Sequence, residues 1–189
     1  RRVRLRALGA VASADIEVTR LELPRAFVGC SVTTSEKDMF SDAPELARRL
    51  AAVKEQLPCR VMPVVTAQVT DEPDADGRFR YFSGDEVEPG SEPLRRALEA
   101  AEGLEAVRIP AGTLVALMPV CVGTQATLPL RVAAARKRFY EEWLPSSGYA
   151  SSCELGFRDV ELYHYRKRRL RRATKLVLEL LFLLEPAQA

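Results

Sequence analysis

The sequence predicts an α+β fold of two βαββ repeats related by a pseudo-twofold axis, with antiparallel sheets and a ligand groove between the halves. Several segments alternate apolar and polar residues, two others repeat apolar residues at helical spacing, and this order recurs in the second half of the chain. Each unit must bury one sheet face beneath its helix. The seam between two such units is where we expect a concave binding site.

The composition is that of a folded and nearly neutral protein. The chain has 189 residues, of which 47% are hydrophobic and 29% charged, and its net charge of +2 gives no overall field that would attract nucleic acid. The four cysteines lie far apart and form no metal-binding motif, which is typical of reduced thiols in a cytoplasmic protein. The longest apolar run, 176–184, is too short for a membrane span. The sequence has no glycine-rich phosphate loop, and we expect neither a cofactor nor a metal.

The first half begins with the strictly alternating stretch from Ile16 to Leu23, which ends at Pro24. Asp42 and Glu45 have the spacing of a capping box, and the apolar residues that follow lie on one face of a helix. The expected elements are strands over 16–23 and 27–33, a helix from 42 to 57, and strands over 60–70 and 78–88.

The second half repeats this order after a linker over 89–103 that holds a short helix. The expected elements are strands over 104–109 and 113–122, a helix over 128–144, and strands over 159–165 and 175–184. Two proline landmarks recur, since Pro24 matches Pro110 and Pro58 matches Pro145. The predicted organisation is a basic lead-in over 1–14, one domain over 15–186 with repeats 15–90 and 104–186, and a tail over 187–189.

The strand from Asp159 to Tyr165 carries the most informative pattern. One face holds Glu161, Tyr163 and Tyr165, and the other holds Val160, Leu162 and His164. A carboxylate beside aromatic rings suits a pocket, where it must be paired, protonated or matched by a ligand. An edge strand whose glutamate faces water fits the pattern equally well.

These residues also resemble a known family. The run from Phe139 to Tyr149, followed by Glu161-Leu162-Tyr163, resembles the GyrI-like small-molecule-binding domain, which has a SOUL-like fold. This domain is the effector-binding module of many AraC-type and MerR-type transcription regulators and also occurs alone. Residues 104–112 and 81–87 look like two further strands of that family, so the resemblance covers about 15–186.

The resemblance implies multidrug or effector recognition in a groove with one buried glutamate, which by position is Glu161. We expect a bulky aromatic or cationic ligand that stacks on Tyr81, Trp143 and Tyr163. Tyr81 is alternatively a surface group, and Trp143 alternatively ends the core stripe of its helix. Some members similar to this chain are hydrolases that open strained cyclopropane rings of DNA-alkylating compounds, and Glu161 would then be the catalytic group. A protein-interaction adaptor is a third possibility.

Two further features carry weaker signals. The basic run Arg166–Arg172 departs from the family pattern, and a solvated hairpin tip is its simplest interpretation, with an acidic partner or an anionic ligand as the alternative. No DNA-binding motif accompanies this run, which disfavours nucleic-acid contact. His164 is the only histidine, so a catalytic triad, a histidine-ligated metal or a haem site lacks partners and a structural role is expected.

Overall fold

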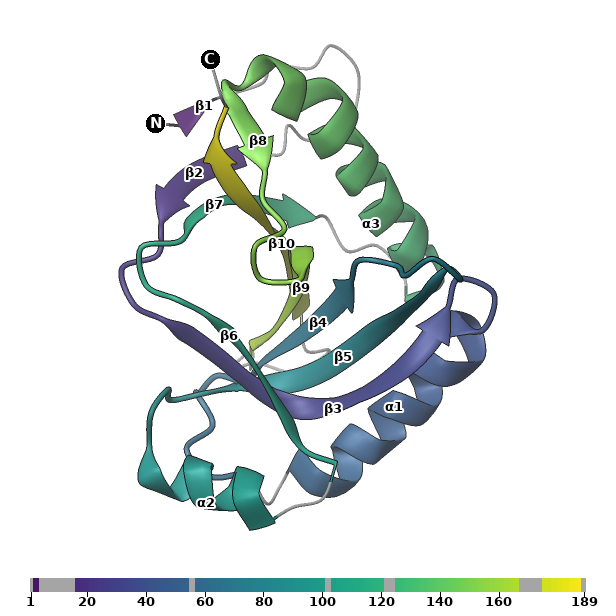
Figure 1. The fold of residues 1–189 in the computed structure, drawn as a ribbon, viewed down its shortest axis with the longest axis vertical. Helices are drawn as coiled ribbons and strands as arrows, with labels where there is room; N and C mark the ends of the chain where they lie inside the picture. The colour runs from purple at the N-terminus through teal and green to yellow at the C-terminus, as the bar shows by residue number, and fades with distance from the viewer. Residues whose placement is uncertain are drawn as a thin grey trace.

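The computed structural model describes residues 2–3, 16–54, 57–100, 103–120, 125–166 and 175–187. Its strands form one curled antiparallel sheet in the order β1-β2-β7-β10-β9-β4-β5-β3-β6, with β8 paired to β10 (Figure 1). The strands are β1 (Arg2–Val3), β2 (Ile16–Arg20), β3 (Arg25–Ser35), β4 (Val65–Asp71), β5 (Arg78–Val87), β6 (Glu105–Ile109), β7 (Leu114–Val120), β8 (Tyr149–Ser151), β9 (Phe157–Arg166) and β10 (Lys175–Pro186). The predicted α+β class is confirmed. No helix in the described ranges is long and apolar enough to span a membrane.

A pseudo-twofold axis passes through the central pair of strands, β4 and β9. Ala67 lies opposite Leu162 at the axis, and the flanking pairs Thr66–Tyr163 and Gln68–Glu161 exchange under the rotation. Outward from this pair, β5 matches β10, β3 matches β7, and β6 matches β2. The predicted duplication is therefore present in the strand order itself.

Each half gives its first strand to the other half. β2 pairs with β7, and β6 pairs with β3, so the pair Glu17–Leu117 is matched by the pair Val107–Phe27. The turn from β2 to β3 crosses the turn from β6 to β7. The Gly112 amide donates to the Leu21 carbonyl at 2.7 Å where the two turns meet. The crossing lies on the left of Figure 1, where the sheet curls toward itself.

The repeat is aligned differently from the proline landmarks. Pro24 directly precedes β3, whereas Pro110 directly follows β6. Under the pairing symmetry Glu17 corresponds to Val107 and Phe27 to Leu117, which makes Leu114 the counterpart of Pro24. The matched prolines pointed to a real duplication but gave the wrong register, because strand pairing and not turn chemistry fixes the equivalence.

The curled sheet packs apolar side chains on both of its faces. Its inner face encloses an apolar cluster from both halves that includes Phe27, Phe82, Leu162 and Leu181, all 0% exposed. The outer face is covered by helix α1 (Met39–Val53) in the first half and by helix α3 (Leu128–Lys137) in the second. Both helices lie on the right of Figure 1, and α2 (Glu92–Ala100) lies apart at the lower left.

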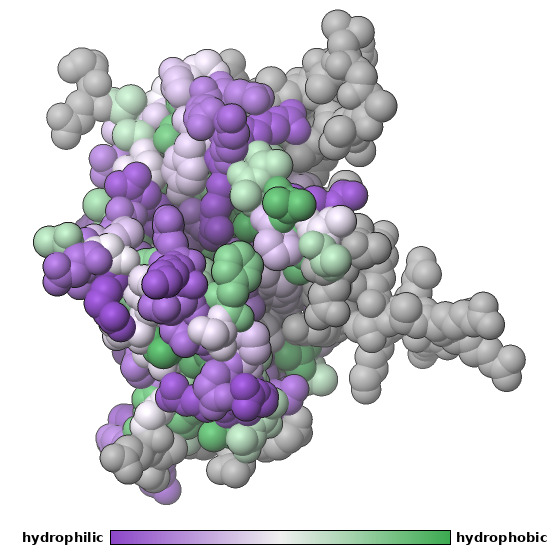
Figure 2. Space-filling model, turned by 90° about the vertical axis from the view of Figure 1, so that its right-hand side faces the viewer, coloured by the Kyte–Doolittle hydropathy of each residue, from purple (hydrophilic) through white to green (hydrophobic). Residues whose placement is uncertain are grey.

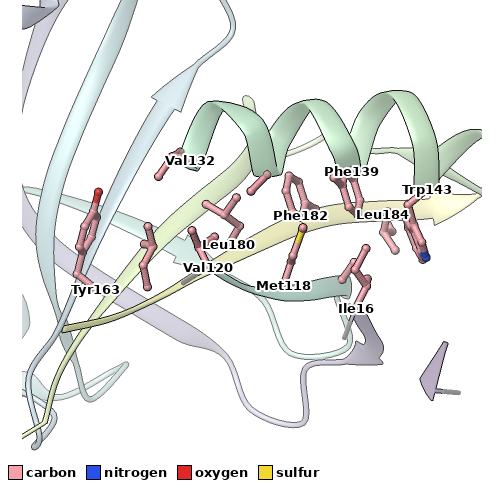
Figure 3. Close-up of a cluster of buried hydrophobic side chains, with 13 residues drawn as sticks. Ile16, Met118, Val120, Val132, Phe139, Trp143, Tyr163, Leu180, Phe182 and Leu184 are labelled. Carbon is pink, nitrogen blue, oxygen red and sulfur yellow. The ribbon is translucent and has the colours of Figure 1, made fainter. Parts of the chain in front are cut away.

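Helix α3 continues without a break into a π-helical segment, η3 (Arg138–Trp143), and a 3-10 turn, η4 (Leu144–Ser146). A further 3-10 turn, η2 (Gln125–Thr127), precedes α3. Val132, Ala135, Phe139 and Trp143 from this unit are buried against β7 and β10, as their spacing predicted. Figure 3 shows Val132, Phe139 and Trp143 pointing from the helix onto the strands.

Several predicted boundaries need correction. The capping box is wrong, because α1 begins at Met39 after Asp38, and the Asp42 carboxylate instead accepts a hydrogen bond from the Thr34 hydroxyl at 2.6 Å. The strand expected over 60–70 begins at Val65, and before it Arg60 forms only an isolated bridge with Val87. β8 was not predicted, since three residues carry too little pattern to recognise.

Candidate functional site

The middle of the outer sheet face lies between α1 and α3 and is polar. Across β9, β4 and β5, Glu161 faces Gln68, and Gln68 faces Ser83. The next row is formed in the same way by Tyr163, Thr66 and Asp85. Because side chains alternate along a strand, both rows point to the same face of the sheet. They form the floor of a groove between the two helices.

One arginine joins two carboxylates beside this floor. The Arg136 guanidinium donates to Asp159 Oδ1 at 2.6 Å and lies 3.0 Å from Glu161 Oε1. The Tyr163 hydroxyl donates to Glu161 Oε2 at 2.5 Å, and the Tyr140 hydroxyl donates to Asp159 Oδ2 at 3.0 Å. Arg136 and Tyr140 are four residues apart in the α3–η3 unit, a spacing that puts both side chains on one face.

The cluster is sheltered and carries a surplus of negative charge. The Asp159 and Glu161 side chains are only 12% and 13% exposed, and together they oppose the single charge of Arg136. Burial works to lower the pKa of Arg136, but Asp159 and Glu161 outweigh it and raise that pKa, so the guanidinium stays charged. A group that brings positive charge to this cluster would therefore balance it.

The phenols around Glu161 are held in their neutral form. Burial raises the pKa of Tyr163, and the Glu161 carboxylate raises it further by its charge and its hydrogen bond. Burial and then the charge of Glu161 raise the pKa of Tyr81 in the same way. Each of these hydroxyls can therefore act as a hydrogen-bond donor at neutral pH.

Two hollows of about 350 Å³ each open along the groove, which is near the lower end for small-molecule sites. One lies against α1, and the other lies between the start of α1 and the α3–η3 unit. The first is lined by Ala47, Leu50, Ala51, Lys54, Arg60, Val64, Thr66, Gln68, Ser83 and Asp85. The second is lined by Glu36, Met39, Thr70, Asp71, Glu72, Pro73, Phe79, Arg136, Tyr140, Arg158 and Asp159. Glu161 borders neither hollow directly. It lies on β9 opposite Gln68 of the first hollow and in contact with Arg136 of the second.

The face that carries the two helices is shown in Figure 2. Hydrophilic side chains predominate on it, and apolar ones form small scattered areas.

The structure brings three of the four predicted ligand-binding residues together. Glu161 and Tyr163 are hydrogen-bonded neighbours, and Tyr81 lies close enough to Glu161 for its pKa to respond to that charge. Trp143 lies elsewhere. It is 5% exposed and stacks on Phe139, with ring centroids 5.0 Å apart. Figure 3 shows Trp143 and Tyr163 at opposite ends of the same cluster, so the core alternative describes Trp143.

Other predicted positions fall outside the groove. His164 is on the face opposite Glu161, with its Nε2 atom 3.8 Å from Glu179 Oε2. Cys30, Cys59 and Cys153 are free thiols. Cys121, the basic run beyond Arg166 and nearly all of the lead-in over 1–14 lie outside the described residues. No group of three or more His, Cys, Asp or Glu side chains in the described ranges could hold a metal ion.

Sequence reasoning missed Arg136, Tyr140 and Asp159. Asp159 shares the strand face of Glu161 two residues away, and Arg136 and Tyr140 lie between the buried positions of the helix stripe. These patterns place the side chains near the groove. The pairing itself depends on how α3 sits over β9, which the local pattern does not contain.

The fold of this chain has counterparts among proteins of known structure. No family model matches the chain, and no curated protein matches it. Solved structures do match over most of its length. One is SAV2435 bound to tetraphenylphosphonium, with a TM-score of 0.55 and 8% identity over 90% of this chain and 93% of that one. Another is the EcmrR C-terminal domain, with a TM-score of 0.56 and 11% identity over 92% of this chain and 99% of that one.

The chain has the GyrI-like fold. EcmrR in a complex with DNA also matches, with a TM-score of 0.59 and 12% identity, and there this chain spans 58% of the longer one. At these identities the likeness establishes the GyrI-like fold, and the role of individual residues rests on the geometry described above.

Proposed function

We propose that this GyrI-like protein binds a bulky aromatic cation in the groove between α1 and α3, and that Glu161 and Asp159 provide the charge that selects it. The observation that carries the proposal is the sheltered cluster in which two carboxylates oppose one guanidinium. A bound cation would balance the remaining negative charge in a setting where water screens it little. The tetraphenylphosphonium bound to SAV2435 belongs to the same class of ligand.

The flanking phenols hold the carboxylate in place. The Tyr163 hydroxyl donates to Glu161 Oε2, and Tyr81 lies near the same charge, while both rings are packed in the core and only 9% and 6% exposed. Arg136 now occupies Glu161 Oε1, so an incoming cation would share the carboxylates with it or shift it toward Asp159. The ligand then replaces one of two contacts of this arginine and leaves the other intact.

The same proposal suggests a role in regulation and a location in the cell. The match to the EcmrR C-terminal domain supports an effector-sensing role in transcription regulation, and the free thiols of Cys30, Cys59 and Cys153 support a reducing, cytoplasmic location. Sequestration of a toxic compound would use the same groove.

The decisive experiment is calorimetric titration with tetraphenylphosphonium and with neutral triphenylphosphine oxide. We expect the cation to bind at least about tenfold more tightly, and Glu161→Gln to remove most of that preference. Glu141→Gln is the matched control, because Glu141 is 64% exposed and pairs only with Lys137 among the described residues. Equal binding of both probes, or a preference unchanged in Glu161→Gln, would contradict the proposal. Trp143 lies in the core away from the groove, so heat and not its fluorescence is the signal measured.

The hydrolase alternative uses the same carboxylate in a different role. A general base must accept a proton from water, whereas Glu161 Oε1 already contacts Arg136 and Oε2 already accepts from Tyr163. This arrangement favours orienting a ligand. Turnover of a cyclopropane-containing electrophile that disappears in Glu161→Gln while binding survives would reverse the preference.

A further inference from the structure

The hollow against α1 contains polar side chains that the charge cluster does not use. Gln68 and Ser83 continue the row that starts at Glu161, each directly opposite its neighbour on the adjacent strand. Neighbouring strands lie about 4.8 Å apart, so the ends of this row are about 10 Å apart. That distance matches the length of a fused three-ring aromatic system. A flat ligand held at Glu161 would therefore extend over Gln68 to Ser83.

Ser83 and Gln68 are free to bind such a ligand. Ser83 is 5% exposed and lines the hollow, yet neither its hydroxyl nor the Gln68 amide has a hydrogen-bond partner anywhere in the described part of the chain. Both groups open onto the hollow, so a ligand that fills it displaces water from them. Leaving them unpaired would then cost free energy, so the ligand that fits best is one that supplies hydrogen-bond partners of its own.

The walls of the hollow indicate which kind of partner fits. Ala47, Leu50 and Ala51 of α1 give it an apolar side, and the two alanines leave room for a ring. At its far end Lys54 and Arg60 carry two positive charges against the one negative charge of Asp85, whose Oδ2 lies 3.4 Å from Arg60 Nε. A second cationic group would be repelled there, whereas an uncharged amino or hydroxyl group would not.

We propose that Gln68 and Ser83 form a second, hydrogen-bonding subsite of the groove, and that the ligand is a planar aromatic cation whose rings carry uncharged amino or hydroxyl groups. The inference rests on the proposed function, and it narrows the ligand class. A purely hydrocarbon cation fills only the Glu161 end of the groove. A substituted planar cation fills both ends.

The test uses two probes of the same shape and charge. Ethidium carries two ring amino groups, and 5-ethyl-6-phenylphenanthridinium is the same cation without them. In titration calorimetry we expect the wild-type protein to bind ethidium at least about tenfold more tightly. The double variant Gln68→Leu with Ser83→Ala should bind both probes within about twofold of each other. Thr33→Val, at an exposed position of β3, is the control and should keep the preference.

Circular dichroism and cooperative thermal unfolding show whether the double variant is folded. If it is not, the two single variants carry the comparison. A wild-type protein that binds both probes equally, or a preference that survives in the variants, overturns the subsite and leaves the proposed function standing. If neither probe binds and tetraphenylphosphonium does not bind either, the proposed function fails and the subsite with it.

Discussion

Arg136 is the residue on which the charge balance of the groove depends. It is the only cation that the structure pairs with Asp159 and Glu161 among the described residues, and both carboxylates are nearly buried. Their mutual repulsion and their loss of water are offset through this one side chain. The same residue therefore stabilises the groove and would compete with the cation that we propose to bind there.

Replacing Arg136 by methionine should lower the free energy of unfolding by about 3 kcal/mol, because two sheltered carboxylates lose their partner. Arg158→Met is the matched control. Arg158 pairs with Glu72 at 2.7 Å, but these side chains are 51% and 42% exposed, so its loss should cost less than about 1 kcal/mol. Denaturant unfolding of both variants measures the difference. A loss in Arg136→Met no larger than in Arg158→Met would mean that the cluster contributes little to stability.

The buried phenols make stability depend on alkaline pH. Burial, and then a neighbouring carboxylate, raises the pKa of Tyr81, Tyr140 and Tyr163 above the ordinary value of 10.0. A pKa that is higher in the folded than in the unfolded state gives stability that is fully present below about pH 10 and is lost as the pH rises above it. Tyrosinate absorbance should show that these phenols ionise only as the protein unfolds. In Tyr163→Phe one of the late-ionising groups should disappear, and loss of an early-ionising group instead would show that Tyr163 is accessible.

At the scale of elements, the two halves differ at one position where β3 pairs with β5. Gly29 pairs with Gly84 there, and a methyl group on Gly29 would overlap the carbonyl oxygen of Ser83. The symmetric place in the second half holds Pro119 opposite Glu179. The glycine pair lets the first half bring its backbones closer together than side chains would allow.

Gly29→Ala should therefore destabilise the protein by about 2 kcal/mol, because the overlapping atom belongs to the backbone and cannot turn aside. Pro119→Ala changes the symmetric residue, which is exposed, and should alter stability by less than about 1 kcal/mol. Thermal and denaturant unfolding compare the two variants. Similar small effects in both would show that the strands can separate at Gly29 without loss.

The π-helical segment η3 sets the direction of the side chains that follow α3. The Leu144 amide donates to the Phe139 carbonyl, five residues back, and this wider turn coincides with the stretch that carries Phe139, Tyr140 and Trp143. Phe139 stacks on Phe182 with centroids 3.6 Å apart, while Tyr140 reaches Asp159. The segment thus packs the core and completes the charge cluster at once.

For the whole molecule, strand exchange makes the two halves depend on each other. β2 completes the sheet of the second half, β6 completes that of the first, and β4 joins β9 across the axis. The inner core also draws its side chains from both halves. Neither half can bury its sheet without the other.

Fragments 15–103 and 104–187 should accordingly be unfolded when produced separately and should form a folded complex when co-expressed. Circular dichroism and denaturant unfolding report each state. A cooperative unfolding transition in either isolated fragment would contradict this dependence. The intact chain is the control, and it should unfold in a single transition.

The sequence by itself determined the fold class, the duplication, the helix faces and the face of β9 that carries Glu161. These properties are local, because alternation along a strand and spacing along a helix fix which residues share a face before any packing occurs. The buried stripe from Val132 to Trp143 and the opposite placement of His164 and Glu161 were therefore predictable.

Only the tertiary structure decided which residues meet. The register of strand pairing set the true alignment of the repeats and exchanged their first strands, and the seat of α3 over β9 joined Arg136 to Asp159 and Glu161. The same packing drew Trp143 into the core and left Gln68 and Ser83 facing the hollow. Contacts between segments far apart in the chain depend on how whole elements fit together, and no local pattern of residue types encodes that fit.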